Sequence, residues 1–162
     1  MNKRWFGGAV AGACMLLGGC ASEESALEAN APLVHETYSA AQFFETTSYR
    51  MGGAGPYAFS AENGDLLISS DETGVYNAYR LDTETRQMTA LTASADRGVY
   101  AESWFPRDDR FIYQQDGNGD ELTHVFVMSE AGEITDLTPG EGHKAGSSGW
   151  ASAGESFSYF RN

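Results

Sequence analysis

The chain has 162 residues with 10 Lys and Arg against 23 Asp and Glu, so its net charge is -13 and one ordinary domain is the most it can form. A hydrophobic content of 41% supports a packed core, and 19 glycines favour a mostly β fold with many tight turns. Nucleic acid is a poor candidate partner, because its phosphates carry the same sign of charge as the protein.

The amino terminus predicts export. Lys3 and Arg4 precede an apolar run over 5–19, which is too short to span a bilayer and long enough for the core of a signal peptide. The run closes with Leu17-Gly18-Gly19-Cys20, which resembles the lipobox of bacterial lipoproteins. The resemblance implies that residues 1–19 are removed and that Cys20 carries the lipid that anchors the protein. The alternative is an ordinary secretory signal in which Cys20 is incidental.

The predicted mature chain is more acidic than the full one and has no disulfide. Cleavage removes Cys14 and two basic residues, which leaves 8 Lys and Arg against 23 Asp and Glu and a net charge of -15. Acylation of Cys20 then leaves no free thiol pair to form a disulfide, so packing must stabilise the fold. Ala21 follows the cysteine, and in similar lipoproteins a residue other than Asp there implies the periplasmic face of the outer membrane.

Residues 20–50 are expected to form a lipidated tether and a short helix. Residues 21–32 are small and acidic without a repeating apolar face, which is typical of a flexible linker. The run Ser39-Ala40-Ala41-Gln42 has the form of a capping box, in which the serine accepts from an early helix amide and the glutamine returns the bond. A helix of one or two turns should follow, and we expect Phe43 and Phe44 to pack against the folded domain.

The remainder of the chain repeats itself at a step of about 46 residues, a signal that decides the fold class. The matched positions are mostly aromatic residues, turn residues and a Leu-Thr pair. At a step of 46 they are Phe59 and Phe105, Glu84 and Glu130, Thr89 and Thr135, Leu91-Thr92 and Leu137-Thr138, Trp104 and Trp150, Phe111 and Phe157, and Tyr113 and Tyr159; at 45 they are Asp71 and Asp116, and Gly74 and Gly119.

Each copy of the repeat predicts a meander of short strands. The predicted strands cover 66–70, 75–81 and 87–92 in the first copy and 111–115, 123–128 and 134–138 in the second, with one more strand ahead, at 99–105 in the second copy. Four short antiparallel strands at this spacing are typical of a β-propeller blade. All four residues of the run 125–128 are apolar, with no alternation of apolar and polar side chains, so both faces of this strand should be covered by neighbouring sheets. A sandwich or a meander barrel is the alternative.

The predicted fold is therefore all-β: an incomplete propeller of about two and a half four-stranded blades after the signal peptide and the short helix. We expect the partial propeller over 51–162, with blades at about 54–92, 99–138 and 145–162. Rings of fewer than about four blades do not close, so we expect the chain to be the amino-terminal part of a longer protein.

Several segments imitate catalytic or binding motifs. The run 149–154 has one residue too many for a nucleophile elbow, so Ser152 is not expected to be a nucleophile. His35, His124 and His143 share no metal-ligand spacing, and His124 fits a satisfied strand histidine better. The glycines of 52–56 follow no predicted strand and open no predicted helix, so they indicate a turn and not a phosphate site.

The run Asp116-Gly117-Asn118-Gly119-Asp120-Glu121 is the strongest candidate for a metal site. Asp116, Asn118 and Asp120 place oxygen side chains at alternate positions, as a calcium loop does. The pattern breaks afterwards, because a calcium loop requires Gly at its sixth position and Glu at its twelfth. We favour a hairpin turn in which Asp, Asn and Gly tolerate positive φ, and no cofactor is expected.

The order of these segments resembles a known family. Residues 38–47, 69–77, 105–110, 119–127 and 136–142 follow one another as in the amino-terminal propeller of prolyl oligopeptidase family serine peptidases, especially the acylaminoacyl-peptidase-like bacterial branch. The resemblance spans about 33–162 and implies a carboxy-terminal α/β-hydrolase domain with the Ser, Asp and His of a serine peptidase, outside these residues. The propeller would then admit oligopeptides and exclude folded proteins. The alternative is a non-catalytic periplasmic propeller that binds a protein or envelope partner.

Overall fold

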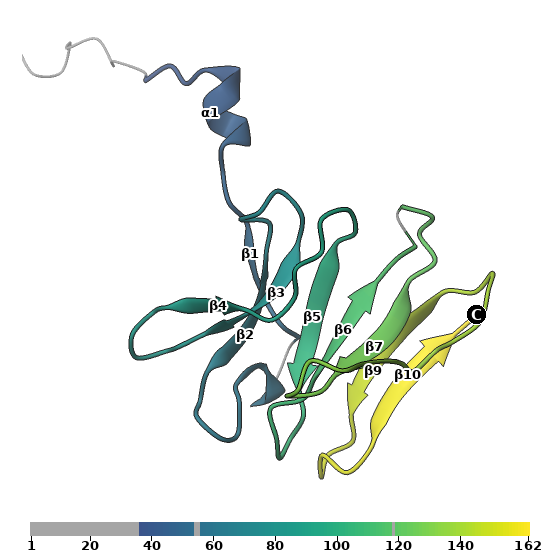
Figure 1. Cartoon of the computed structure of the whole chain (residues 1–162). Coiled ribbons are helices and arrows are strands. Elements are labelled where there is room, and N and C mark those ends of the chain that lie inside the picture. Colours follow the sequence, from purple (N-terminus) through teal and green to yellow (C-terminus); the bar gives the residue numbers. More distant parts are fainter. Residues whose placement is uncertain (1–35, 54–55, 118) are drawn as a thin grey trace, which may run out of the picture. The chain divides into compact units, whose positions relative to one another are not determined.

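The computed structural model describes residues 36–53, 56–117 and 119–162. One compact unit covers Ala40–Asn162. The described strands of this unit form three antiparallel sheets, of four, four and two strands, each with its strands in chain order (Figure 1). The mostly β fold predicted from the sequence is confirmed.

Sheet A contains β1 (Tyr49–Met51), β2 (Leu66–Ser70), β3 (Asn77–Leu81) and β4 (Met88–Ala90). The positions of the last three agree with the sequence pattern. One more strand was expected ahead of 66–70, within the blade at about 54–92, but β1 lies before residue 54, mostly in the segment expected to be tether and helix. Three residues are too few to display the alternation that identifies a strand, and all three are exposed. The first sheet therefore begins ahead of residue 54, and the glycine at 52 does follow a strand, contrary to expectation.

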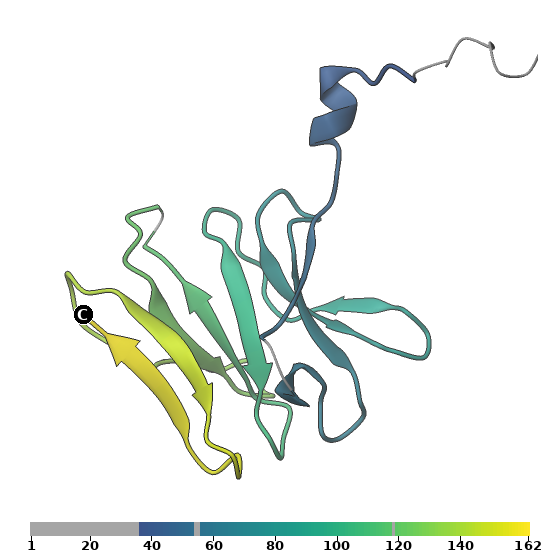
Figure 2. The ribbon, with the colours of Figure 1, turned by 180° about the vertical axis from the view of Figure 1, so that it is seen from behind.

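Sheets B and C follow along the chain. Sheet B contains β5 (Val99–Trp104), β6 (Phe111–Gln115), β7 (His124–Met128) and β8 (Ile134–Asp136). Sheet C contains β9 (Ala145–Trp150) and β10 (Phe157–Arg161). Figure 1 and the reverse view in Figure 2 place sheet B between sheets A and C.

Each sheet is joined to the next by the same backbone hydrogen bond. The first amide of β5, Val99 N, donates to Tyr76 O over 2.8 Å, and the first amide of β9, Ala145 N, donates to Thr123 O over 2.7 Å. Tyr76 and Thr123 directly precede β3 and β7, the third strands of their sheets. The repeat found in the sequence therefore corresponds to a hydrogen bond that recurs between each sheet and the next.

The paired Leu-Thr positions of the repeat also make matching contacts. Ala78 N donates to Thr92 Oγ1 over 2.9 Å, and Val125 N donates to Thr138 Oγ1 over 3.0 Å. The leucine before each threonine donates its amide to the carbonyl of the same strand residue, Ala78 or Val125. The threonine hydroxyl therefore continues the strand pairing where the fourth strand ends.

Replacing Thr138 with valine should lower the free energy of unfolding by about 1–3 kcal/mol, because Val125 N loses its acceptor while both residues stay buried. Thr92→Val should cost a similar amount at the matching position, whereas Thr135→Val, on an exposed site of β8, should change stability little. Urea unfolding measures all three variants. Equal losses of stability in Thr135→Val and Thr138→Val would contradict a stabilising hydrogen bond between Val125 N and Thr138 Oγ1.

Two hydrophobic cores lie between the sheets. The residues of the first lie between sheets A and B: Leu67, Ala78, Val99, Ala101, Trp104, Phe111, Tyr113 and Met128, with Leu91 and Phe126 against them. Those of the second lie between sheets B and C: Ile112, Val125 and Ala145, with Phe105, Val127, Leu137, Trp150 and Phe157 against them. Both faces of sheet B are therefore buried.

Strand β7 shows this directly, as the sequence predicts. Phe126 and Met128 belong to the first core, and Val125 and Val127 belong to the second. Because successive side chains of a strand point to opposite faces, a run of four apolar residues requires cover on both sides.

The first strand of every sheet is irregular at the same place. In β5 the register shifts at Glu102, and in β9 it shifts at Ser148, so each strand has one unpaired bulge residue. In sheet A the ladder between β1 and β2 ends at Met51. A short 3-10 helix follows at Pro56–Ala58, and Phe59 then forms an isolated bridge with Leu66. Bulges are over-represented at sheet edges and next to functional sites, where they redirect a side chain.

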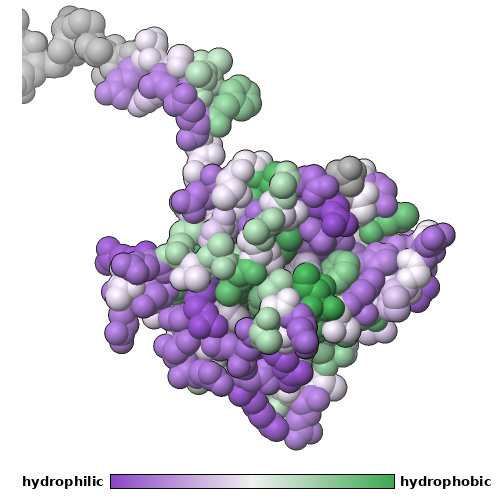
Figure 3. Space-filling view, viewed as in Figure 1, coloured by the Kyte–Doolittle hydropathy of each residue, from purple (hydrophilic) through white to green (hydrophobic). Residues whose placement is uncertain are grey.

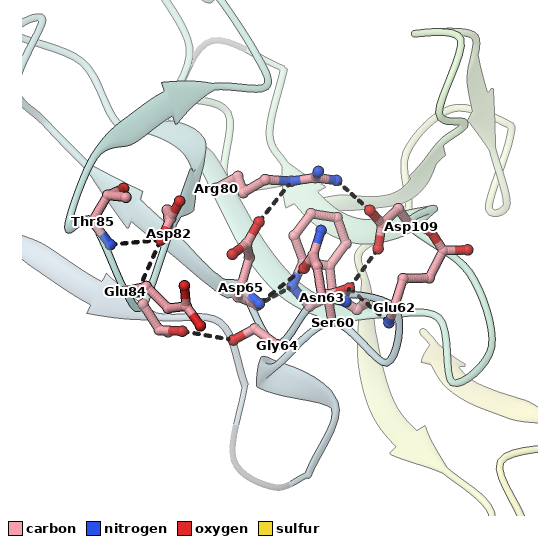
Figure 4. A network of polar contacts seen from close by, with 12 residues as sticks. Ser60, Glu62, Asn63, Gly64, Asp65, Arg80, Asp82, Glu84, Thr85 and Asp109 are labelled. Atoms are coloured by element: carbon pink, nitrogen blue, oxygen red, sulfur yellow. Dashed lines mark hydrogen bonds and ion pairs between the residues drawn. The ribbon is translucent and has the colours of Figure 1, made fainter.

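A polar network ties sheet A to the turn between β5 and β6 (Figure 4). The carboxylate of Asp109, which is buried, accepts from Ser60 Oγ and from Arg80 Nη2, both over 2.6 Å. The Arg80 guanidinium also lies 5.1 Å from the ring centroid of Trp104 and 3.9 Å from a carboxylate oxygen of Asp65. The network therefore joins strand β3 and the turn before β2 to the neighbouring sheet.

The short helix predicted ahead of the sheets is present as α1 (Ala40–Phe44). Its aromatic residues do not pack as expected, since Phe43 is 66% and Phe44 is 87% exposed. Figure 3 shows hydrophobic surface in this segment. A helix of five residues has no buried face to orient it, so the presence of adjacent aromatic side chains did not specify a packing partner.

Candidate functional site

The residues singled out in the sequence fall into three groups. Cys20, Asn118 and His35 lie outside the described residues, so the lipid anchor and the complete calcium set remain predictions. Asp116 and Asp120 lie in the turn between β6 and β7, His124 is the first residue of β7, and His143 stacks on His124. Ser152 is exposed in the turn between β9 and β10.

The carboxylates of the Asp116 turn are bonded to local backbone amides. Asp116 Oδ2 accepts from Gly119 N over 3.2 Å, and Asp120 Oδ1 accepts from Gly117 N over 3.0 Å and from Leu122 N over 2.9 Å. Gly119 adopts a φ of 87°. These contacts are typical of a hairpin turn stabilised by Asp side chains.

We expect millimolar calcium to leave the melting temperature of the chain unchanged, because the turn already uses Asp116 and Asp120 as acceptors for its own amides. Thermal unfolding with and without calcium tests this, with magnesium as the control ion. A calcium-specific rise in melting temperature that Asp120→Asn removes would instead support the metal site.

Two histidine rings stack beside this turn. The ring centroids of His124 and His143 lie 4.8 Å apart, His124 Nδ1 is 2.9 Å from Asp136 Oδ2, and His143 Nε2 is 2.8 Å from Thr138 O. In the part of the chain that the structure describes, the hydrogen bonds of the two rings are to a carboxylate and to backbone carbonyls, and none is to a hydroxyl or a thiol. His124 is thus a satisfied strand histidine, as expected, although its Asp136 partner was not foreseen. Strand register could have indicated the pair, since Asp136 lies opposite Phe126, two residues from His124.

The bulged first strands surround a second feature, a hollow of about 410 Å³. We call it the inner hollow, and its lining comes from the first strands of sheets B and C, from the start of β10 and from the segment after β1. The lining residues are Gly52, Gly53, Tyr57, Ala58, Glu102, Ser103, Ser147, Ser148, Gly149, Trp150 and Phe157. No sequence motif pointed to it.

Glu102 is the one ionisable carboxylate among those lining residues, and it is half-buried. Gln114 Nε2 donates to its Oε1 and Ser147 Oγ donates to its Oε2, each over 2.7 Å. Because of the bulge, two consecutive residues, Glu102 and Ser103, both contact sheet C, while Ala101 and Trp104 on either side belong to the first core. The two neutral donors hold the carboxylate at the junction of sheets B and C.

Trp150 forms the apolar wall of the inner hollow. Its ring packs edge-to-face against Phe105, Phe157 and Tyr57, with centroid distances of 5.0, 5.3 and 5.8 Å, and its Nε1 donates to Ser103 Oγ over 2.9 Å. Edge-to-face packing with a bonded indole fixes the orientation of the ring. The hollow thus combines a rigid aromatic wall with one oriented carboxylate.

Electrostatic shifts occur elsewhere in the unit. The Arg110 guanidinium, hydrogen-bonded to Asp108 at 2.8 and 2.9 Å, lowers the pKa of that carboxyl below its usual value. The stabilisation this gives is present above the unfolded pKa and is lost as pH falls through the folded one. Burial raises the pKa of Tyr113. Both shifts belong to the packing of sheet B and its turns.

Within the described ranges, no group of three or more His, Cys, Asp and Glu side chains is placed to hold a metal ion. Among the same residues, no helix is long and apolar enough to cross a bilayer. Comparison of the chain with protein-family models, with curated proteins and with solved structures finds no match.

Proposed function

We propose that sheets A, B and C are successive blades of an incomplete β-propeller, with the third blade represented by two strands. The support is the repeated linkage, in which the first amide of one sheet donates to the residue before the third strand of the preceding sheet. The burial of both faces of sheet B by its neighbours is a second support. In a propeller each blade is covered in this way, and the first strand of every blade lies nearest the central channel.

We propose further that the chain is the propeller segment of a lipid-anchored serine peptidase of the prolyl oligopeptidase type. The succession of segments that resembles this family supports the proposal, together with the blade-like sheets that those segments form. The hydrolase domain with its Ser, His and Asp would follow these residues in the full-length protein. This chain would supply no catalytic group.

The role proposed for the sheets is to control which substrates reach the hydrolase domain. If β1, β5 and β9 face the channel, the inner hollow lies on the path that an oligopeptide takes, and the bulges at Glu102 and Ser148 shape that path. A channel of packed blades excludes folded proteins because its walls do not open without loss of the cores between sheets. Oligopeptides are therefore the proposed substrate class.

The proposed location is the periplasmic face of the outer membrane, with the lipid on Cys20 as the anchor. Two or three acyl chains bind a bilayer far more strongly than one, at about 0.8 kcal/mol per buried methylene. The acidic segment 21–32 would act as the tether between membrane and sheets.

Two measurements test the proposal. The reading frame beyond residue 162 should encode an α/β-hydrolase domain with a G-x-S-x-G elbow, and the full-length protein should hydrolyse short peptides in a manner blocked by a serine-directed phosphonate. The 162-residue chain should hydrolyse none. A full-length protein that lacks the elbow and binds an envelope protein would replace the peptidase with the non-catalytic alternative.

A separate experiment tests the lipid anchor. The protein should incorporate radiolabelled palmitate, and Cys20→Ser should abolish the incorporation.

A further inference from the structure

The carboxylate of Glu102 carries a negative charge that no described side chain neutralises. Its two contacts, from Gln114 and Ser147, come from neutral donors. None of the described ion pairs includes it. A half-buried carboxylate without a cation favours an added positive charge, because hydrogen bonds between two ionised groups are the strongest of their kind.

Arg50 is the basic residue to consider as a partner within the protein. Arg50 and Glu102 both line a smaller hollow, of about 210 Å³, on the sheet A side of β5. The Arg50 guanidinium is nevertheless directed to the ring of Tyr100, 5.5 Å from its centroid, and makes no ion pair with Glu102. The two oxygens of Glu102 accept instead from Gln114 of sheet B and from Ser147 of sheet C. The inner hollow therefore retains a net negative charge.

The rest of the inner hollow suits the body of an organic cation. Trp150, Tyr57 and Phe157 offer aromatic rings, whose faces attract cations and whose edges pack against apolar groups. The hydroxyls of Ser147 and Ser103 are already engaged, with Glu102 and with the Trp150 indole. A third hydroxyl, of Ser148, lies exposed in the lining. Glu102 is nevertheless the one charged group among the lining residues, and its position beside an aromatic wall favours a protonated amine over a neutral or anionic molecule.

We propose that the inner hollow binds an organic ammonium ion, with the cation on the Glu102 carboxylate and the apolar body against Trp150. The inference needs only the geometry of the hollow and is independent of the propeller and peptidase proposals. The matching position of the repeat in sheet C, Ser148, has no carboxylate, so the repeat does not explain why a glutamate is present at 102.

The test is a titration of the full chain with benzylammonium, followed by the amide and indole resonances in NMR. The Trp150 Nε1–H signal should shift and saturate, whereas that of Trp104, which donates to Asp65 O within the first core, should stay in place. Benzyl alcohol, a neutral molecule of similar shape, should bind far more weakly. This comparison uses one protein and does not depend on any variant folding.

Variants assign the effect to the carboxylate. Glu102→Gln keeps the size of the side chain and one acceptor oxygen while it removes the charge, and it should weaken benzylammonium binding about ten- to a hundredfold. Glu84→Gln removes the same charge from an exposed turn and should leave affinity unchanged, which separates local from overall charge. Ser147→Ala removes a neutral donor and should preserve preference for the cation.

Three results would overturn the inference. The first is equal binding of benzylammonium and benzyl alcohol, which would make the hollow merely apolar. The second is equal affinity of the Glu102→Gln variant and the original chain. The third is the absence of a saturable shift at Trp150 throughout the millimolar range. None of these outcomes bears on the presence of a downstream hydrolase domain, so the two proposals fail separately.

Discussion

Replacing Trp104 with alanine is expected to lower the free energy of unfolding by about 3–5 kcal/mol, the range found for large aromatic residues removed from a core. Trp104 is fully buried between sheets A and B, packs edge-to-face against Phe111 at 5.8 Å, and donates Nε1 to Asp65 O over 3.2 Å. The variant would lose the ring, its hydrogen bond and the cation-π contact of Arg80. Total stabilities of domains are about 5–15 kcal/mol, so the variant should be largely unfolded under mild denaturant.

Trp150 gives a matched control for this prediction. It occupies the equivalent last position of its strand, in sheet C, but it is only half-buried and lies on the inner hollow. Trp150→Ala should therefore cost clearly less than Trp104→Ala. Urea unfolding followed by circular dichroism measures both. If the two variants lost equal stability, or if Trp104→Ala lost less than about 1.5 kcal/mol, the placement of the main core between sheets A and B would be wrong.

Removal of the Asp109 side chain should cost about 2–4 kcal/mol, since Asp109→Ala leaves Ser60 Oγ and the Arg80 guanidinium without their shared acceptor. Arg80 is part-exposed and retains Asp65 at 3.9 Å, so the loss should fall below that of a fully buried broken pair. Asp109→Asn should cost less, because it keeps one acceptor for Ser60. Chemical unfolding of the two variants gives both values.

The adjacent carboxylate supplies the control. Asp108 pairs with Arg110 at the surface, and exposed pairs of this kind contribute about 0–1 kcal/mol. Asp108→Asn should therefore change stability far less than Asp109→Asn does, although both remove one carboxylate from the same turn. A double variant of Asp109→Ala with Arg80→Met should recover part of the loss, because no charge is then left without a partner. Additive losses in that double variant would contradict the proposed network.

Much of the fold could be predicted because the 46-residue repeat presents the same strand pattern in two copies, and each copy supports the prediction made from the other. Strand β6 has the predicted bounds, and the apolar run of β7 correctly required two covering sheets. Such features depend on alternation within a strand, which local sequence displays. The failures have a different origin: the three-residue β1 is too short to alternate, and α1 carries aromatics whose packing partner no pattern specifies.

Most of the polar contacts could not be predicted from the sequence. The Arg80 to Asp109 pair spans 29 positions and joins different sheets, so it depends on how the sheets stack and not on any local motif. The inner hollow had one available signal. Val99 and Ala101 are two positions apart, as residues on one face of a strand are, but Trp104 follows three positions later and still belongs to the same core. This extra residue indicates a bulge at 102 or 103. Cys20 and Asn118 lie outside the described residues and stay predictions.

Residue-specific hydrogen exchange by NMR tests the repeated linkage of the sheets most directly. The amides of Val99 and Ala145, which open β5 and β9, are predicted to exchange slowly and at similar rates, because each donates to the preceding sheet. The amide of Ala131, which is exposed in the turn before β8 and donates to no described group, serves as the fast reference. Exchange of Val99 and Ala145 at rates close to this reference would show that the sheets are not joined in this way, and the stacked repeat would have to be abandoned.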